Sequence, residues 1–365
     1  MAGYSATLYA NNINTAWWQN PNRPEQFGFL SEAYDFHIQI RKRDGEVLYA
    51  WHILPIAVYT RNERALLDEP SGLSHDVAKN LAFKLLSTDP ESRLVINFHG
   101  NAGTVAQGWR TDTYRSLTSS APDKIHVLTV DYRGFGYSTG SPTEQGLIAD
   151  GIAAVVWAMK DAHIPPNRIV IFGQSLGTAV ATAVAEHFVL NSPTIEFAGI
   201  VLVAGFSDIP TLMTTYAAGG IIPILSPLRP YPALQRFFAR HIQETWFSAA
   251  RLNNFVRRSR NLDLKIIHAR TDYNIPWAHS TTLFYAAANG TCEGSMSRKQ
   301  IDDAKITEKI GDDSWAWYWK AGNARDEGIK KIKLEIVQHG GHNRLPTYAV
   351  AAKAIMNIFE LQTLP

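Results

Sequence analysis

The stretch Gly-Gln-Ser-Leu-Gly at positions 173–177 carries the strongest chemical signal in this sequence. It matches G-x-S-x-G, in which a serine sits on a tight turn from a strand into a helix. Its context fits, because the apolar run 168–172 precedes it and the helix-like segment 175–190 follows it. A helix N-terminus directs free N–H groups toward such a turn. We therefore predict that Ser175 is a nucleophile for acyl transfer rather than a helix cap.

Candidates for the acid and the base follow the serine along the chain. A serine hydroxyl needs a base to take its proton, and in the fold that uses this motif the order is serine, acid, histidine. Asp272 follows the apolar run 264–268, and we predict that it is the acid, with Asp208 as the alternative. For the base we predict His342, since it lies beyond two glycines that let the loop turn back, with His339 as the alternative.

Acyl transfer also requires two backbone N–H donors that hold the oxyanion. The N–H of Leu176, directly after the serine, is expected to be one donor. The loop 99–103 should supply the other, from Asn101 or from Ala102. Side chains expected to contact the substrate lie around the motif and in a long insertion, where they would line a cavity or form the insertion's own core: Ala102, Gln174, Phe206, Ile222, Phe238 and Trp246.

The elements that must position these residues alternate along the chain. Two runs with alternating polarity, 34–40 and 46–54, predict an antiparallel hairpin. Short apolar runs typical of a parallel sheet buried on both faces follow at 94–98, 126–130, 168–172, 199–204, 264–268 and 332–337. Helix-like segments lie at 143–162, 175–190, 276–288 and 346–361. The pattern predicts an α/β fold with a mostly parallel, doubly wound sheet of eight strands.

Two segments are too long to be simple connections. Residues 207–262 contain five prolines and predict an inserted lid. Residues 289–330 hold Trp315, Trp317 and Trp319 in alternation, which predicts a short strand or a cavity wall. We therefore expect an N-terminal extension, a catalytic core in two pieces and a lid, at 1–33, 34–206 with 263–365, and 207–262.

Composition narrows the function classes. The 365 residues include 35 basic and 33 acidic side chains, and this balance argues against a nucleic-acid-binding protein. The single cysteine, Cys292, excludes an intrachain disulfide. Motifs for nucleotide cofactors and metals are absent, so neither is expected. Without a signal peptide or a run of about 18 apolar residues, we expect a cytoplasmic protein whose lid could rest on an intracellular membrane. The oligomeric state stays open.

Together these motifs resemble the α/β-hydrolase superfamily, and within it the eukaryotic monoacylglycerol and lysophospholipid lipases. The resemblance spans roughly residues 34–360 and rests on the stretches 99–103, 131–138, 173–177, Asp272 and 341–343. It implies an α/β-hydrolase fold, with Ser175 as nucleophile, Asp272 as acid and His342 as base.

The resemblance also bears on the substrate. It implies hydrolysis of carboxylic esters with apolar acyl chains, by a fungal-type member without the N-terminal membrane anchor of many relatives. One alternative is an esterase or thioesterase acting on a specialised-metabolite ester or lactone. Another is a hydrolase-fold binding protein or receptor with little turnover, although the complete set of serine, aspartate and histidine candidates counts against it.

Overall fold

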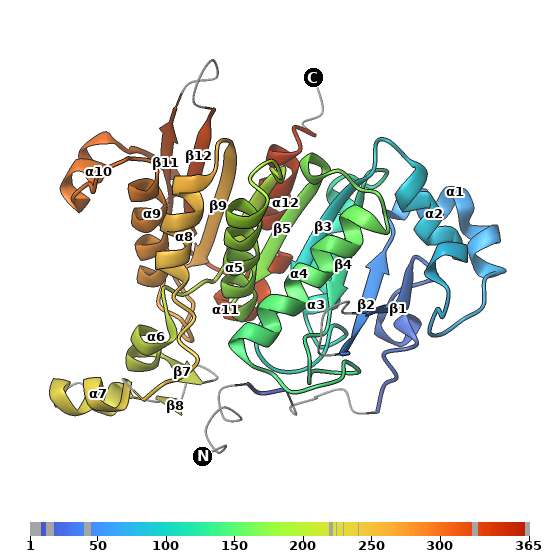
Figure 1. Cartoon of the computed structure of the whole chain (residues 1–365), viewed down its shortest axis with the longest axis horizontal. Helices are drawn as coiled ribbons and strands as arrows, with labels where there is room; N and C mark the ends of the chain where they lie inside the picture. Colours follow the sequence, from blue (N-terminus) through green and yellow to red (C-terminus); the bar gives the residue numbers. More distant parts are fainter. Residues whose placement is uncertain are drawn as a thin grey trace. The chain divides into compact units, whose positions relative to one another are not determined.

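The computed structural model describes residues 9–11, 18–39, 45–218, 222–223, 225–228, 230–239, 241–322 and 328–361 (Figure 1). The chain divides into two compact units, the first made of Met1–Phe172 with Thr347–Pro365 and the second of Gly173–Pro346. Strand β5 (Ile169–Gln174) runs from the first unit into the second. Within the described part of the chain, no helix is both long and apolar enough to cross a membrane.

Strands of the first unit include the predicted hairpin. Their order is β1-β2-β4-β3, where β1 is Ala33–Gln39, β2 is Val47–Ile53, β4 is Ile125–Val130 and β3 is Arg93–Phe98. β1 and β2 are antiparallel, with Ala33 opposite Ile53, as predicted. β2 is also antiparallel to β4, whereas β4 and β3 are parallel. Every residue of β4 is buried, which explains why four of its six residues are apolar.

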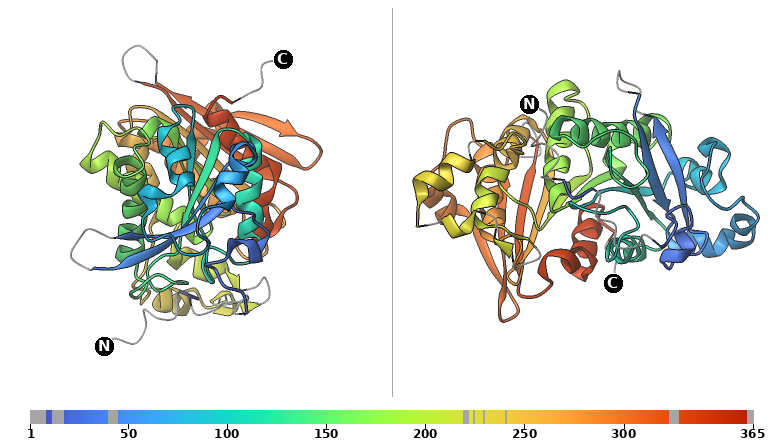
Figure 2. Two further views of the ribbon diagram at one scale, coloured as in Figure 1. Left: turned by 90° about the vertical axis from the view of Figure 1, so that its right-hand side faces the viewer. Right: turned by 90° about the horizontal axis from the view of Figure 1, so that it is seen from below.

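Helices of the first unit lie on both faces of these strands. α4 (Glu144–Lys160) begins where Thr143 accepts a hydrogen bond from the Gly146 N–H, and it contacts β1 and β3. α3 (Arg110–Ser120) contacts β4 and α12 (Ala349–Ile358). Figure 2 shows α3 and α12 on the face of these strands opposite to α4. α1 (Ile56–Leu67) and α2 (Leu81–Thr88) contact each other. Helices α1, α2 and α3 were not predicted. α3 in particular carries polar residues on its buried face.

Strands of the second unit are more numerous than predicted. Their order is β6-β9-β12-β11-β10, at Gly199–Val203, Leu262–Ala269, Lys330–Val337, Ser314–Ala321 and Ile306–Ile310. β6, β9 and β12 are parallel, whereas β11 and β10 are antiparallel additions from the segment 289–330. The prediction of eight strands was therefore wrong by these two. β10 was not predicted because four of its five residues are exposed, so its sequence has no apolar run.

The alternating tryptophans belong to β11. Trp315 and Trp317 lie with ring centroids 4.6 Å apart, and Trp317 packs 5.4 Å from Phe284. The indole N–H of Trp319 donates to the Thr291 hydroxyl at 3.1 Å. Since Phe284 belongs to α9 (Ala278–Gly290), these side chains attach the added strands to that helix. The strand interpretation is confirmed. These rings contact α9 and the residues that flank it, and Nζ of Lys305 lies 3.2 Å from the centroid of the Trp317 ring.

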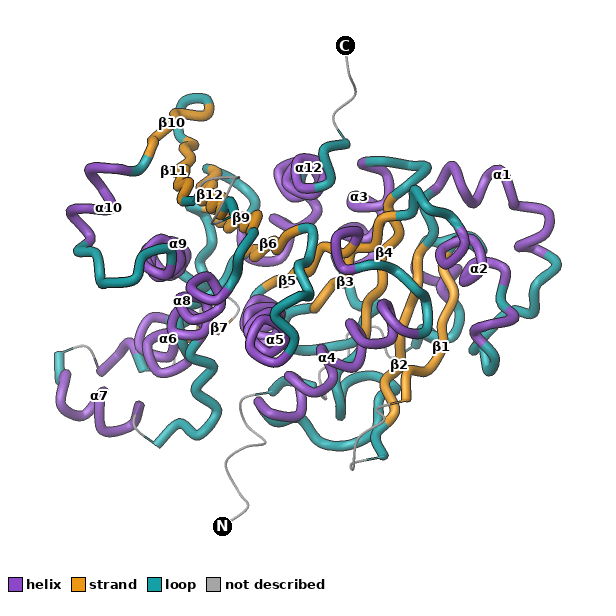
Figure 3. The backbone as a smooth tube through the Cα atoms, turned by 45° about the horizontal axis from the view of Figure 1, so that its top comes forward, coloured by secondary structure: helices purple, strands orange, loops and turns teal. Residues whose placement is uncertain are grey.

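Helices of the second unit form a layer that includes part of the expected lid. α8 (Ser248–Arg258) contacts both α5 (Leu176–Asn191) and α9, as Figure 3 also shows. The remaining elements of 207–262 are α6 (Ile209–Thr215), β7 (Ala217–Ala218), β8 (Ile222–Pro223) and α7 (Pro232–Ala239). Because α8 packs in one layer with α5 and α9, we remove it from the predicted lid at 207–262 and propose the narrower range 207–247. α10 (Arg298–Ala304) and α11 (Gly341–Arg344) complete the unit.

Candidate active site

Ser175 occupies the predicted turn between β5 and α5. Its φ of 55° and ψ of −118° are unusual for a residue with a side chain, and such strain is typical of functional sites. The Ser175 N–H donates to the carbonyl of Val203 at 3.0 Å, which ties the turn to β6. A Cβ atom at Gly173 would lie 2.3 Å from the carbonyl oxygen of Gly177, so only glycine fits there. The local sequence therefore enforces this tight turn.

His342 lies between the serine and an aspartate. Its Nε2 atom is 2.9 Å from Oγ of Ser175, and its Nδ1 atom is 2.8 Å from Oδ2 of Asp272. Gly340 and Gly341, with φ of 137° and 60°, turn the chain just before it. Ser175, Asp272 and His342 all belong to the second unit. The arrangement can transfer the serine proton to the imidazole, with the carboxylate orienting the ring.

The alternative acid and base occupy other positions. Asp208 caps α6, where its Oδ1 atom accepts the Thr211 N–H at 2.6 Å. Its Oδ2 atom accepts the hydroxyl of Ser207 at 3.0 Å. His339 is exposed. The structure therefore brings Asp272 and His342, rather than these alternatives, to Ser175.

The carboxylate of Asp272 is buried and has four donors. Oδ1 accepts the N–H groups of Asn274 and Ile275, each at 2.9 Å. Oδ2 accepts from His342 and also lies 3.2 Å from Nε2 of His268. Burial alone would raise the pKa of Asp272, but hydrogen bonds from the two histidines outweigh it and hold this pKa below its ordinary value. Sequence reasoning missed His268, although it lies four residues before the aspartate.

The expected oxyanion donors lie in different units. Leu176 is the first residue of α5, so its N–H has no acceptor within the helix. Asn101 and Ala102 lie in the first unit, in a loop where Ala102 and Gly103 have φ of 74° and 67°. The Ala102 N–H already donates to Oδ1 of Asn101 at 3.0 Å. The use of Leu176 and Asn101 as a pair stays a prediction.

Arg110, a further residue that sequence reasoning missed, binds the carbonyl oxygens of this loop. Its buried guanidinium donates to Gly100 at 2.9 Å, to Ala102 at 2.5 Å and to Thr104. In a planar trans peptide the C=O and the next N–H point in opposite directions. The bond to the Gly100 carbonyl therefore turns the N–H of Asn101 away from Arg110.

Gln174 was predicted to contact substrate, and the structure gives its side chain another bond. The residue is buried, and its Nε2 atom donates to the backbone carbonyl of His342 at 3.2 Å. The residue before the serine therefore holds the loop that carries the histidine.

The other predicted substrate contacts are scattered. Phe206 and Trp246 are buried. Phe238 is exposed on α7. Ile222 begins β8, but its side chain lies outside the described part of the structure. Contact of these side chains with substrate stays a prediction.

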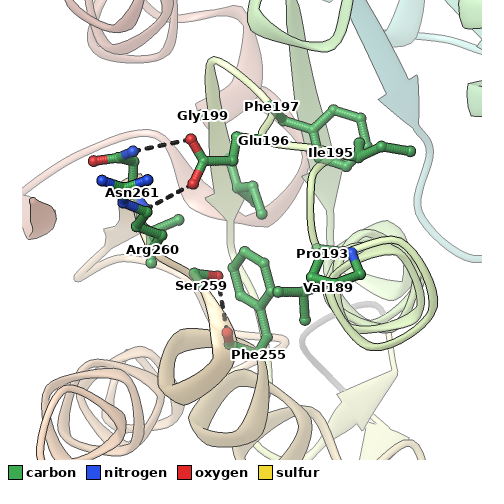
Figure 4. Close-up of a pocket in the computed structure, with 13 residues that line it drawn as sticks. Val189, Pro193, Ile195, Glu196, Phe197, Gly199, Phe255, Ser259, Arg260 and Asn261 are labelled. Atoms are coloured by element: carbon green, nitrogen blue, oxygen red, sulfur yellow. Dashed lines mark hydrogen bonds between the residues drawn. The ribbon is translucent and has the colours of Figure 1, made fainter. Parts of the chain in front are cut away.

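A small hollow lies away from Ser175 in the second unit. Its volume is about 20 Å³, which is room for one water, and Figure 4 shows the residues that line it. Its wall includes Ala185 and Val189 of α5, so at 1.5 Å per residue it lies about 15 Å or more along the helix from Ser175. The carboxylate of Glu196 beside it is bound by Asn261. No group of three or more His, Cys, Asp or Glu side chains in the described ranges could hold a metal ion.

Known proteins resemble this chain in sequence. The pattern of the alpha/beta hydrolase family matches residues 95–352. Lysophosphatidylserine lipase ABHD12 is 26% identical over 284 residues in Gallus gallus and 25% identical over 304 residues in Danio rerio. Protein ABHD12B of Homo sapiens is 27% identical over 282 residues. These alignments cover 77%, 83% and 77% of this chain, but only 65%, 70% and 69% of the relatives.

Solved structures resemble the fold. An esterase of Pyrococcus furiosus superposes with a TM-score of 0.53 at 16% identity, over 98% of this chain and 99% of that one. Est1E of Butyrivibrio proteoclasticus, solved with ferulic acid, superposes with a TM-score of 0.50 at 14% identity, over 89% of this chain and 98% of that one. At such identities the likeness concerns the fold alone.

Proposed function

Because this chain belongs to the alpha/beta hydrolase family, we propose that it is a serine hydrolase that cleaves carboxylic esters with apolar acyl chains. The observation that carries the proposal is the position of His342. Its two ring nitrogens lie 2.9 Å from Oγ of Ser175 and 2.8 Å from Oδ2 of Asp272. These are hydrogen-bond distances at which a base can activate a nucleophile and be oriented by an acid.

The proposed reaction runs through an acyl-enzyme. Oγ of Ser175 attacks the ester carbonyl while Nε2 of His342 takes the hydroxyl proton. The carboxylate of Asp272 stabilises the imidazolium, and the N–H groups of Leu176 and Asn101 hold the oxyanion. His342 then protonates the leaving alcohol. It next activates a water molecule, which attacks the acyl-enzyme, releases the acid and restores Ser175.

A lipid ester of the monoacylglycerol or lysophospholipid type is the substrate class that we propose. The relatives named lysophosphatidylserine lipases support a lysophospholipid in particular. The lid supports it as well, because Phe237 and Phe238 of α7 are 55% and 47% exposed. Between Asp208 and Glu244 the sequence holds three arginines and no acidic residue. We propose that this segment contacts the surface of an anionic membrane, where such a substrate resides.

Covalent labelling tests the nucleophile. A fluorophosphonate probe should label the folded protein, and Ser175→Ala should abolish the labelling. A well-folded wild-type protein that takes up no probe would refute the proposed nucleophile. A series of p-nitrophenyl esters from acetate to palmitate then tests the acyl preference. Rates that rise with chain length support a lipid ester, whereas a sharp preference for acetate would favour a small specialised-metabolite ester.

A further inference from the structure

His268 is a buried histidine that the proposed reaction does not use. It lies near the end of β9, and its side chain is completely buried, as is that of Asp272. Nδ1 of the ring lies 2.7 Å from Oγ of Ser280 on α9. Nε2 lies 2.9 Å from the carbonyl oxygen of Ile275 and 3.2 Å from Oδ2 of Asp272. Both nitrogens therefore have partners in the same small region of the second unit.

These contacts determine which nitrogen carries a proton. The carbonyl of Ile275 and the ionised carboxylate of Asp272 can only accept hydrogen bonds. Nε2, which faces both of them, must therefore be the protonated nitrogen. The hydroxyl of Ser280 can either donate to Nδ1 or accept from it, so it accommodates the ring in this orientation. His268 consequently directs an N–H group at Asp272.

The two histidines meet the same oxygen atom of the carboxylate. Oδ2 of Asp272 accepts from Nδ1 of His342 and from Nε2 of His268, while Oδ1 is held by backbone N–H groups. Because the carboxylate is buried, water cannot freely replace a lost donor, and the loss therefore costs free energy. Without His268, Oδ2 would also direct more of its negative charge at His342, which would favour the protonated imidazole.

We propose that His268 is a positioning residue, which holds the Asp272 carboxylate in orientation and limits its pull on the proton of His342. The proposal rests on the proposed function, since it assigns His342 as the base. His268 acts only through Asp272 and does not touch the reacting atoms. Its effect on catalysis is to limit the negative charge that Oδ2 of Asp272 directs at the imidazole of His342.

The main test compares two replacements of His268. His268→Phe keeps a planar ring but removes the donor, and it should lower kcat per probe-labelled active site about 10- to 100-fold, as expected for a hydrogen bond to a charged group. It should also move the acidic limb of the kcat/KM profile to higher pH. His268→Gln places an amide N–H near the position of Nε2 and should return both values toward those of the wild type. A general loss of stability would not move the acidic limb.

His279→Phe is the matched control. His279 is also buried, on α9, but it bonds to Ser207 and Thr215 rather than to Asp272. It should cost stability and leave the pH profile in place. Several titratable groups surround His268 and Asp272, so the pH profiles of the two variants must be compared with each other. These groups are His342 on α11, His279 on α9, Asp208 before α6 and Tyr216 after it.

Nuclear magnetic resonance separates this proposal from the proposed function. In protein with ¹⁵N-labelled histidine, the midpoint of the His342 titration should move to higher pH in His268→Phe, whether or not any ester is cleaved. If the phenylalanine variant does not fold, Ser280→Ala should give a smaller shift in the same direction, because it releases Nδ1 of His268. An unchanged midpoint in the folded variant, or an equal shift in His279→Phe, would overturn the proposal. Absence of hydrolysis by the wild type would instead count against the proposed function.

Discussion

The side-chain amide of Gln174 donates a hydrogen bond of 3.2 Å to the backbone carbonyl of His342. The residue before the proposed nucleophile thus holds the residue proposed as its base. We predict that Gln174→Leu lowers kcat about 10-fold with little change in KM, because the lost bond positions the base without touching substrate. Steady-state kinetics with p-nitrophenyl butyrate would measure this. A raised KM at unchanged kcat would favour the substrate contact that the sequence suggested.

The choice of base can be tested with two histidines of one loop. His342→Ala and Asp272→Asn should each lower kcat by about 10⁴-fold without loss of the fold, since proton transfer and ring orientation depend on them. His339→Ala should keep wild-type kcat because this side chain is exposed. Circular dichroism would verify folding in each case. Inactivity of His339→Ala, with an active His342→Ala, would show that the base is wrongly assigned.

The buried arginine of α3 should matter for the transition state. Arg110→Leu releases the carbonyl oxygens of Gly100, Ala102 and Thr104, so the N–H of Asn101 loses its fixed direction. We expect kcat to fall about 10²-fold, comparable with loss of one oxyanion donor. Arg115→Ala is the matched control on the same helix, because Arg115 bonds to Phe27 and Gly28 instead. Equal losses of kcat in both variants would point to damage of α3 as a whole.

Exposed aromatic side chains of α7 should bind a membrane surface. The double variant Phe237→Ser with Phe238→Ser should reduce cosedimentation with phosphatidylserine-containing vesicles several-fold, because it removes apolar area that would enter the interface. In the single variant Phe237→Ser, which keeps Phe238, cleavage of the soluble p-nitrophenyl acetate should not change. Ile306→Ser removes an even more exposed apolar side chain on β10 and should not alter vesicle binding. If the control loses binding as much as the double variant does, α7 is not the contact.

The stability of the first unit should depend on pH through Asp35 of β1. Burial is the main cause that raises the pKa of this carboxyl to about 6, above its value in the unfolded chain. The folded state then holds the proton more tightly, so its stability falls as pH rises from about 4 through 6. Asp35→Asn should therefore gain about 2 to 3 kcal/mol relative to wild type between pH 4 and pH 7. Urea unfolding at both values measures this, with the exposed Asp123→Asn as control.

Much of the fold was predictable because its signals are local. Strand runs buried on both faces, such as Gly199–Val203, are apolar at successive positions, and this can be seen without knowing their neighbours. The turn at Ser175 was predictable for a similar reason, since Gly173 is required by backbone atoms only four residues away. By contrast, α3 and β10 were missed, because buried polar residues hide the first and an exposed strand face hides the second.

The sequence by itself determined the residue types that can perform acyl transfer and their order along the chain. It left two acids and two bases open, since Asp208 and Asp272 both follow strands and His339 and His342 share one loop. Only the tertiary structure brought His342 to within hydrogen-bond distance of both partners. It alone revealed Arg110 and His268, because the importance of a buried donor depends on which acceptors the packing places beside it.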